Sequence, residues 1–361
     1  MNHKRRLQQI QRELPRHKFD YLLISHLPNV RYLCGFTGSA GALVLTETAC
    51  TFFTDGRYTA QAKDEVRSAR VVIGLKAPLL AAADWISRSV KRGKKIVGIE
   101  GEHLSVAGQS RLAQLLPRTV RLKQTPGLVE QARMVKDAEE LQAIREAVQL
   151  GAGLFDTVIA SARPGVRETA VAAKMEFEAR QAGADGMSFE TIIAGGKRSA
   201  LPHGRASQQP LPANGFAVCD FGVILTGYCS DMTRTLYMGR ANREAREFYE
   251  TVREAQLAGI SAVRPGVAVG EVDRAARKVL KKAGLGRYFS HSTGHGVGLE
   301  IHEPPRVAAG QSEVLQPGMV ITIEPGAYIP GKWGVRIEDM VVVTESGCEV
   351  LTPTTKELIA V

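Results

Sequence analysis

Short apolar runs alternate with helical stretches along the first 125 or so residues of the chain. The runs have the length and the β-branched or aromatic content of strands. We expect strands at residues 20–25, 42–46, 50–54 and 95–100. Leu7, Ile10 and Leu14 recur at helical spacing, and further helices are expected at residues 59–67 and 79–90. Strands that alternate with helices are typical of an α/β domain.

A proline and a glycine within residues 124–127 mark a boundary between two domains. A helix is expected from Lys136, since Asp137, Glu139 and Glu140 would complement the dipole of its first turn. We therefore predict an N-terminal domain at residues 1–127 and a second domain at residues 128–361. The total length of 361 residues also favours two domains.

The second domain contains an internal repeat. The sequence Arg-Pro-Gly-Val at residues 163–166 recurs at residues 264–267, which is 101 positions later. Each copy precedes an alanine-rich helix that ends at a glycine, Gly183 or Gly284, and glycine is the residue that a left-handed helix C-cap prefers. A repeat of this length indicates a duplicated half-domain, because solenoid repeats are shorter, about 20–50 residues.

Two acidic residues interrupt a predicted hairpin in the first copy. If Leu225 and Thr226 form its turn, Asp220 and Asp231 lie directly opposite each other on one face. Two such carboxylates repel each other unless a proton or a cation lies between them. They could instead be two surface acids, but the strand that carries Asp220 is apolar and is expected to be buried.

The second copy shows the same pattern. Around a turn near Gly331, Glu324 and Glu338 are expected to oppose each other within apolar strands. Four buried carboxylates are untenable without compensation, because even one unpaired buried charge costs several kcal/mol. Two divalent cations would neutralise them, so the pattern predicts a metal site.

His295 lies in a glycine-rich stretch, and His291 and His302 are its neighbours in sequence. Four oxygen ligands with one imidazole suit manganese and also tolerate iron(II), cobalt or zinc. Bridging carboxylates would hold two ions in the arrangement of two-metal hydrolases. The predicted ligands are Asp220, Asp231, His295, Glu324 and Glu338.

Composition narrows the remaining classes of protein. The 47 Lys and Arg residues exceed the 37 Asp and Glu residues, which gives a net charge of +10 and raises nucleic acid as a partner. No zinc finger or aromatic-interleaved basic stripe supports that partner, so we expect none. The five cysteines do not suggest a disulfide framework, and no apolar run is long enough to span a membrane. The expected location is the cytoplasm.

Several motifs resemble those of the pita-bread metallopeptidases, in particular the Xaa-Pro branch of aminopeptidase P and prolidase. In the second domain they lie at residues 202–204, 220–222, 227–235, 294–303, 323–326 and 334–339, and in the N-terminal domain at residues 29–41 and 54–58. The resemblance covers nearly the whole chain. It implies a creatinase-type α/β N-terminal domain and an α+β catalytic domain with a pseudo-twofold repeat, and it also implies a homodimer.

The resemblance assigns roles to individual residues. Asp231 and Glu338 would bridge two metal ions, and Glu324 would move the proton of the attacking water. His203 and His302 would contact the substrate and the tetrahedral intermediate. His291 matches a further active-site histidine, and Arg336 would orient Glu338 or form a structural salt bridge.

The implied reaction is hydrolysis of the bond before a proline in the second position of a peptide. The segment at residues 304–313 lacks an insertion that larger prolidases use to bind the dipeptide carboxylate, which favours aminopeptidase P. Compact prolidases also lack it, so an Xaa-Pro dipeptidase is the alternative, with Arg306 either as a substitute anchor or as an ordinary surface residue. A non-catalytic binding module on the same fold is a more remote alternative.

Overall fold

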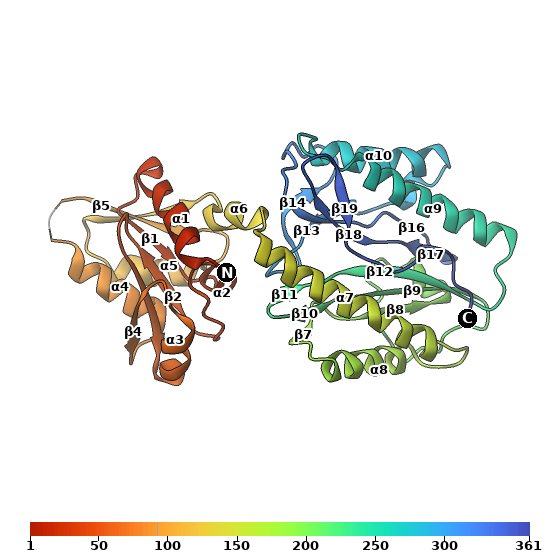
Figure 1. Cartoon of the computed structure of the whole chain (residues 1–361), viewed down its shortest axis with the longest axis horizontal. Helices are drawn as coiled ribbons and strands as arrows, with labels where there is room; N and C mark the ends of the chain where they lie inside the picture. The colour runs from red at the N-terminus through yellow and green to blue at the C-terminus, as the bar shows by residue number, and fades with distance from the viewer. Residues whose placement is uncertain (92) are drawn as a thin grey trace. The chain divides into compact units, whose positions relative to one another are not determined.

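Two units make up the structure, a computed structural model that describes residues 1–91 and 93–361. They are Met1–Arg133 and Met134–Val361, here called the first and the second unit (Figure 1). The helix α6 (Leu128–Met134) begins directly after Gly127. The assignment of residues 1–127 to an N-terminal domain and of residues 128–361 to a catalytic domain stays a prediction.

A six-stranded sheet forms the core of the first unit, in the order β4-β3-β2-β1-β5-β6. β2 pairs antiparallel with β1 and with β3, and the outer strands pair in parallel. The strands are β1 (Tyr21–Ile24), β2 (Ala42–Leu45), β3 (Cys50–Asp55), β4 (Arg70–Gly74), β5 (Lys95–Glu100) and β6 (Val120–Thr125). The helices are α1 (His3–His17), α2 (Leu27–Cys34), α3 (Thr59–Glu65), α4 (Pro78–Ser89) and α5 (Val106–Leu115), with a 3₁₀ turn η1 (Gly56–Tyr58).

The expected α/β pattern is confirmed in this unit, and within residues 1–127 two strands and two α-helices are additional to it. β4 and β6 are the two edges of the sheet. Their partly exposed faces weaken the apolar signal on which a strand prediction depends. α2 has only 8 residues and α5 buries one side chain, Leu112, so their amphipathic patterns are short or faint.

Four helices of the second unit form two pairs, and Figure 1 shows α8 and α10 on opposite sides of its strands. α7 (Ala138–Ser161) begins with a capping box between Asp137 and Glu140. The others are α8 (Glu168–Gln181), α9 (Arg243–Ala262) and α10 (Val269–Lys282). Gly183 and Gly284 follow α8 and α10 with φ of +94° and +76°, which confirms the expected glycine after each helix. None of the described helices has the length and apolar character needed to cross a bilayer.

The strands repeat in two halves, which we call the first half (residues 134–240) and the second half (residues 241–361). β8, β9 and β12 form a sheet in the first half, while β13, β15 and β18 occupy the centre of a sheet in the second. Strands of the first half are β7 (Gly186–Met187), β8 (Ile192–Gly195), β9 (Gly215–Phe221), β10 (Val223–Leu225), β11 (Tyr228–Cys229) and β12 (Met232–Met238), with η2 at Gly196–Ala200. Strands of the second half are β13 (Gly294–Gly296), β14 (Glu303–Val307), β15 (Val320–Ile323), β16 (Gly326–Ile329), β17 (Trp333–Arg336), β18 (Asp339–Val343) and β19 (Cys348–Val350), with η3 at Gly286–Tyr288.

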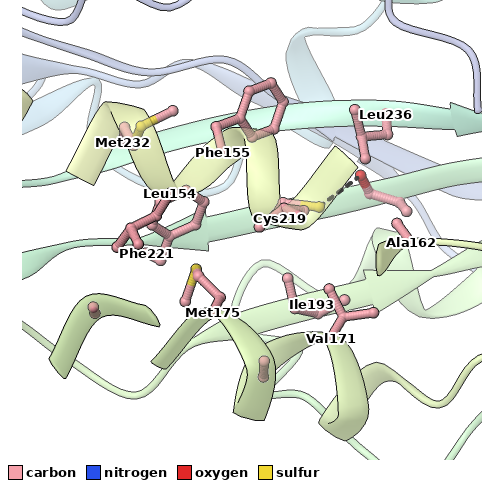
Figure 2. Close-up of a cluster of buried hydrophobic side chains, with 14 of the residues drawn as sticks. Leu154, Phe155, Ala162, Val171, Met175, Ile193, Cys219, Phe221, Met232 and Leu236 are labelled. Carbon is pink, nitrogen blue, oxygen red and sulfur yellow. Dashed lines mark hydrogen bonds between the residues drawn. The ribbon is translucent and has the colours of Figure 1, made fainter. Parts of the chain in front are cut away.

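Buried side chains of α7 and α8 pack against the strands of the first half (Figure 2). Leu154 and Phe155 come from α7, and Met175 comes from α8. Cys219 lies among them, and its thiol donates a hydrogen bond to the carbonyl oxygen of Ala217 at 3.7 Å. Successive side chains of β9 point to opposite faces of the sheet. Cys219 faces the helices, so Asp220 faces away from them.

The two hairpins that carry the acidic residues differ in how closely their register matches the expected one. In the second half, Ile329 pairs with Trp333 and Ile323 with Asp339, which is the register expected around Gly331. In the first half, the expected turn at Leu225 and Thr226 is wrong, because Leu225 pairs with Tyr228.

Thr226 and Gly227 form the turn of the first hairpin, with φ of +48° and +80°. Positive φ at both central residues is typical of a type I′ turn, whose twist matches that of the strands. Asp220 consequently opposes Thr233 rather than Asp231, which lies between β11 and β12.

Candidate metal centre

A cavity of about 740 Å³ opens in the second unit between residues of both halves. All nine residues predicted as metal ligands or catalytic residues line it. From the first half these are His203, Asp220 and Asp231, and from the second half His291, His295, His302, Glu324, Arg336 and Glu338. The chain therefore gathers in one place side chains that are separated by up to 135 positions in sequence.

Four carboxylates and one imidazole form the inner part of this cavity. Asp220 is the penultimate residue of β9, Asp231 precedes β12, Glu324 follows β15 and Glu338 precedes β18. Asp231, Glu338 and His295 each offer a ligand atom, and these atoms lie within 4.8 Å of one another. The Nε2 atom of His295 lies 3.6 Å from Asp231 Oδ2 and 3.6 Å from Glu324 Oε1.

The carboxylates carry a charge that the protein alone does not balance. Burial raises the pKa of Asp231 and of Glu338 well above the usual range, and neighbouring carboxylates add to both shifts. Burial also raises the pKa of Glu324 to about 8, with a further contribution from Asp220. Arg336 opposes these shifts but supplies only one positive charge.

Two oxygen atoms in the group give a direct test of whether a cation fits. Asp220 Oδ1 and Asp231 Oδ1 are buried, and neither has a hydrogen-bond partner among the described residues. Buried polar atoms are normally paired, so atoms without a partner need an explanation. Divalent cations at these oxygens would explain them and would relieve the repulsion, so the residues fit a metal site.

The tautomer of His295 also suits a metal ligand. Its Nδ1 atom lies 3.0 Å from the carbonyl oxygen of Gly296, and a carbonyl only accepts, so Nδ1 carries the proton. Nε2 is left unprotonated and faces the carboxylates. Burial lowers the pKa of His295 to about 4, which keeps the ring neutral near neutral pH.

Of the two roles expected for Arg336, the structure shows a salt bridge, and its partner is Asp220 rather than Glu338. Its guanidinium forms a buried ion pair with Asp220 Oδ2, and its Nε donates to the hydroxyl of Thr233 at 3.1 Å. Glu338 accepts a hydrogen bond of 2.7 Å from that same hydroxyl. The side chain of Arg336 reaches across to β9 and therefore holds Asp220. Glu338 is held instead by the hydroxyl of Thr233.

Both ring nitrogens of His291 form hydrogen bonds with other residues of the protein. Nδ1 donates to the carbonyl oxygen of Ser292 at 2.8 Å, so Nε2 accepts from the hydroxyl of Tyr328 at 2.9 Å. Tyr328 in turn accepts from Arg336 at 2.7 Å. Burial lowers the pKa of His291 to about 4, so the ring is neutral and supports Arg336 through Tyr328.

Tyr328 and Thr233 also belong to the site, although neither was predicted from the sequence. Thr233 lies within the motif at residues 227–235, and its place opposite Asp220 would have followed from the correct hairpin register. Tyr328 pairs with Gly334 across β16 and β17, which puts it near Arg336. That neighbourhood was predictable from the register of the second hairpin.

His203 and His302 lie on loops that border the cavity. His203 is exposed between η2 and β9, and His302 is in the loop before β14. The rings of His302 and His295 are 4.4 Å apart between centroids. Burial lowers the pKa of His302, and His203 adds to that shift.

Comparisons with known proteins agree with this arrangement. A model of metallopeptidase family M24 matches residues 142–345, which is more than half of the chain. The chain belongs to metallopeptidase family M24. A model of the creatinase/prolidase N-terminal domain matches residues 6–135. This M24 member is therefore an enzyme and not the non-catalytic binding module that we kept as a remote alternative.

Individual relatives match this M24 peptidase along nearly its whole length. The Xaa-Pro dipeptidase of Pyrococcus furiosus is 37% identical over 99% of this chain and 100% of its own. The structure of the Xaa-Pro dipeptidase from Bacillus anthracis covers both chains completely at 37% identity, with a TM-score of 0.94. The X-Pro aminopeptidase from Thermotoga maritima matches with a TM-score of 0.87 at 34% identity, over 95% of this chain and 98% of its own.

These matches confirm the expected fold, a creatinase-type N-terminal domain with a pita-bread catalytic domain. Membership of the M24 metallopeptidases also implies divalent metal ions, in agreement with the carboxylate cluster.

Proposed function

We propose that this M24 peptidase is an Xaa-Pro dipeptidase that uses two divalent metal ions. The relatives that support this reading, from Pyrococcus furiosus and Bacillus anthracis, are Xaa-Pro dipeptidases that match the chain nearly end to end. The proposal corrects the preference for aminopeptidase P that we drew from the short segment at residues 304–313.

The four carboxylates and the imidazole of the cavity would hold the ions: Asp220, Asp231, His295, Glu324 and Glu338. The observation that carries this set is the pair of buried oxygens, Asp220 Oδ1 and Asp231 Oδ1, that lack a partner among the described residues. A site rich in oxygen with one imidazole favours Mn²⁺, and Co²⁺, Zn²⁺ or Fe²⁺ are alternatives. Such ions act as Lewis acids towards a carbonyl oxygen and make water a stronger nucleophile.

The protein's own side chains would move the protons and stabilise the developing charge. Glu324, whose carboxylate lines the cavity, is the candidate to accept the proton of the attacking water. It would then pass this proton to the leaving proline nitrogen, which has no hydrogen of its own in the peptide bond. His203 and His302 would donate hydrogen bonds to the scissile carbonyl and the oxyanion.

Arg306 is the proposed anchor for the carboxylate of the dipeptide. Its side chain is exposed on β14, lines the cavity, and sits opposite His295 in the strand register. Within residues 1–91 and 93–361, its guanidinium forms no hydrogen bond or ion pair. Arg205 also lines the cavity, but it already pairs with Glu190 at 2.9 Å.

Kinetics on matched peptides tests the proposal. With manganese present, an Xaa-Pro dipeptide is expected to show a higher kcat/KM than the Xaa-Pro-Yaa tripeptide with the same first residue. Loss of a hydrogen bond to a charged group costs about 1.5–3 kcal/mol, so Arg306→Ala is expected to lower kcat/KM for the dipeptide about tenfold or more, chiefly through KM. Arg205→Ala is the matched control. A higher kcat/KM for the tripeptide would instead favour the aminopeptidase.

Three further expectations stay predictions: a homodimer, a cytoplasmic location, and the absence of a nucleic-acid partner. The mass of the protein in solution tests the homodimer. Retention on DNA at low salt tests for a nucleic-acid partner.

A further inference from the structure

Each half of the second unit buries one carboxylate on its second helix, away from the cavity. Glu168 is the first residue of α8 and has an exposed fraction of 0%. Asp273 lies on α10 with an exposed fraction of 1%. The repeat of 101 residues brings Asp273 to the position of Ala172, four residues from Glu168. Four residues are about one helical turn, so the two carboxylates lie on the same face of equivalent helices.

Glu168 binds the chain on both sides of His203. Before His203, its carboxylate accepts hydrogen bonds from the backbone N–H of Gly195 at 2.8 Å and from Arg198 Nε at 3.0 Å. After His203, it accepts from the backbone N–H of Ser207 at 3.0 Å and from its hydroxyl at 2.6 Å. Arg198 closes the loop by donating to the carbonyl of Arg205 at 2.7 Å.

Asp273 binds the segment that leads to the ligand His295. Its Oδ1 accepts from the hydroxyl of Thr293 at 2.8 Å and from Arg277 at 2.8 Å. Arg277 in turn donates to the carbonyl oxygens of Phe289 and His291, both at 3.0 Å. The same segment reaches a second proposed ligand, because the backbone N–H of Glu324 donates to the carbonyl of Thr293 at 2.8 Å.

We infer that Glu168 and Asp273 are matched positioning residues, and that each fixes the histidine-bearing segment of its own half. Both use one buried carboxylate and one arginine to hold several backbone groups, and such charge-assisted hydrogen bonds are the stronger kind. Neither carboxylate lines the cavity, so both act through the segments they hold.

The two positions differ in what they hold, and this difference makes the inference testable. The Asp273 segment carries the proposed ligand His295 and contacts Glu324, so it governs metal binding. The Glu168 loop carries His203 but no proposed ligand, so it governs turnover after the metal has bound. The inference rests on the proposed ligand set, but metal titration needs no peptide and therefore separates its failure from failure of the proposed substrate.

The experiment compares two pairs of variants in the full chain. Asp273→Asn and Thr293→Val remove contacts of the second half, while Glu168→Gln and Ser207→Ala remove contacts of the first. Thr293→Val and Ser207→Ala each delete one hydroxyl, so they preserve a test if the carboxamide variants fail to fold. The matched controls are Glu271→Gln on α10, whose side chain pairs with Arg274 at the surface, and Glu178→Gln on α8. Manganese affinity is measured by competition with a chelator, alongside kcat and KM for an Xaa-Pro dipeptide.

Asp273→Asn and Thr293→Val are expected to weaken manganese binding about tenfold or more, the usual effect of losing a group that orients a ligand. Glu168→Gln and Ser207→Ala are expected to keep the manganese affinity and to lower kcat about tenfold. Equal losses of metal affinity in both pairs would overturn the inference, because they would indicate a general loss of stability. Unchanged metal affinity and unchanged kcat in the two hydroxyl variants would also overturn it.

Discussion

The two halves of the second unit share a scaffold but differ in what they bring to the metal centre. The first half supplies two carboxylates, Asp220 and Asp231, whose buried oxygens lack partners among the described residues. The second half supplies two carboxylates, the imidazole and Arg336. Both halves therefore place two acids at the site, but only the second half adds the proposed nitrogen ligand, on β13, and the charge that offsets Asp220, on β17.

Contacts between the halves show why neither is sufficient alone. Arg336 from the second half holds Asp220 of the first, and Thr233 from the first half holds Glu338 of the second. Each half thus orients a ligand of the other.

Asp231→Asn is expected to abolish peptidase activity and to reduce the metal content together. The change removes a charge from the proposed ligand set while it keeps the shape of the side chain. Activity on an Xaa-Pro dipeptide and metal content by elemental analysis measure both effects. Full activity with both metal ions retained would contradict a shared site between the halves.

Arg234→Met is expected to lower the free energy of unfolding by about 3–5 kcal/mol, because it breaks a buried ion pair between the halves. Arg234 and Asp339 are 2.7 Å apart and nearly inaccessible, and Arg234 also donates to the carbonyl of Glu338. Urea denaturation measures the change. Arg243→Ala, at an exposed pair with Glu247, is the control and is expected to cost under about 0.5 kcal/mol. Equal decreases in the free energy of unfolding for the two variants would contradict a stabilising role of the buried pair between the halves.

Glu349→Gln is expected to have the smallest effect, under about 1 kcal/mol, because its ion pair with Arg145 is partly exposed. The pair joins β19 of the second half to α7 of the first. Hydrogen bonding to Arg145 lowers the pKa of Glu349, so the carboxylate stabilises the fold above the ordinary glutamate pKa. This stability is lost as the pH falls through the lowered pKa.

Urea denaturation of the wild type and of Glu349→Gln from pH 7 down to acid pH checks this sign. The stability difference is expected to shrink as the pH falls. A difference that stays constant over that range would show that the ion pair contributes nothing.

Much of the fold and of the candidate site could be predicted from local patterns. The 101-residue repeat, the buried acids in apolar strands and the register around Gly331 depend on neighbouring residues and on strand periodicity. The turn of the first hairpin was misplaced because Thr226, a β-branched residue, adopts a positive φ that such residues rarely show. A shift in that turn changed the partner of Asp220 from Asp231 to Thr233.

The sequence by itself determined the fold class, the family and the residue types that gather at the cavity, since these follow from patterns within each half. Only the tertiary structure decided which side chains form hydrogen bonds and ion pairs with one another at the site. The pairing of Arg336 with Asp220, the occupied ring of His291 and the carboxylates of Glu168 and Asp273 depend on side chains that meet across large sequence separations. A long side chain such as arginine can reach several acceptors, and packing of the surrounding elements selects one of them.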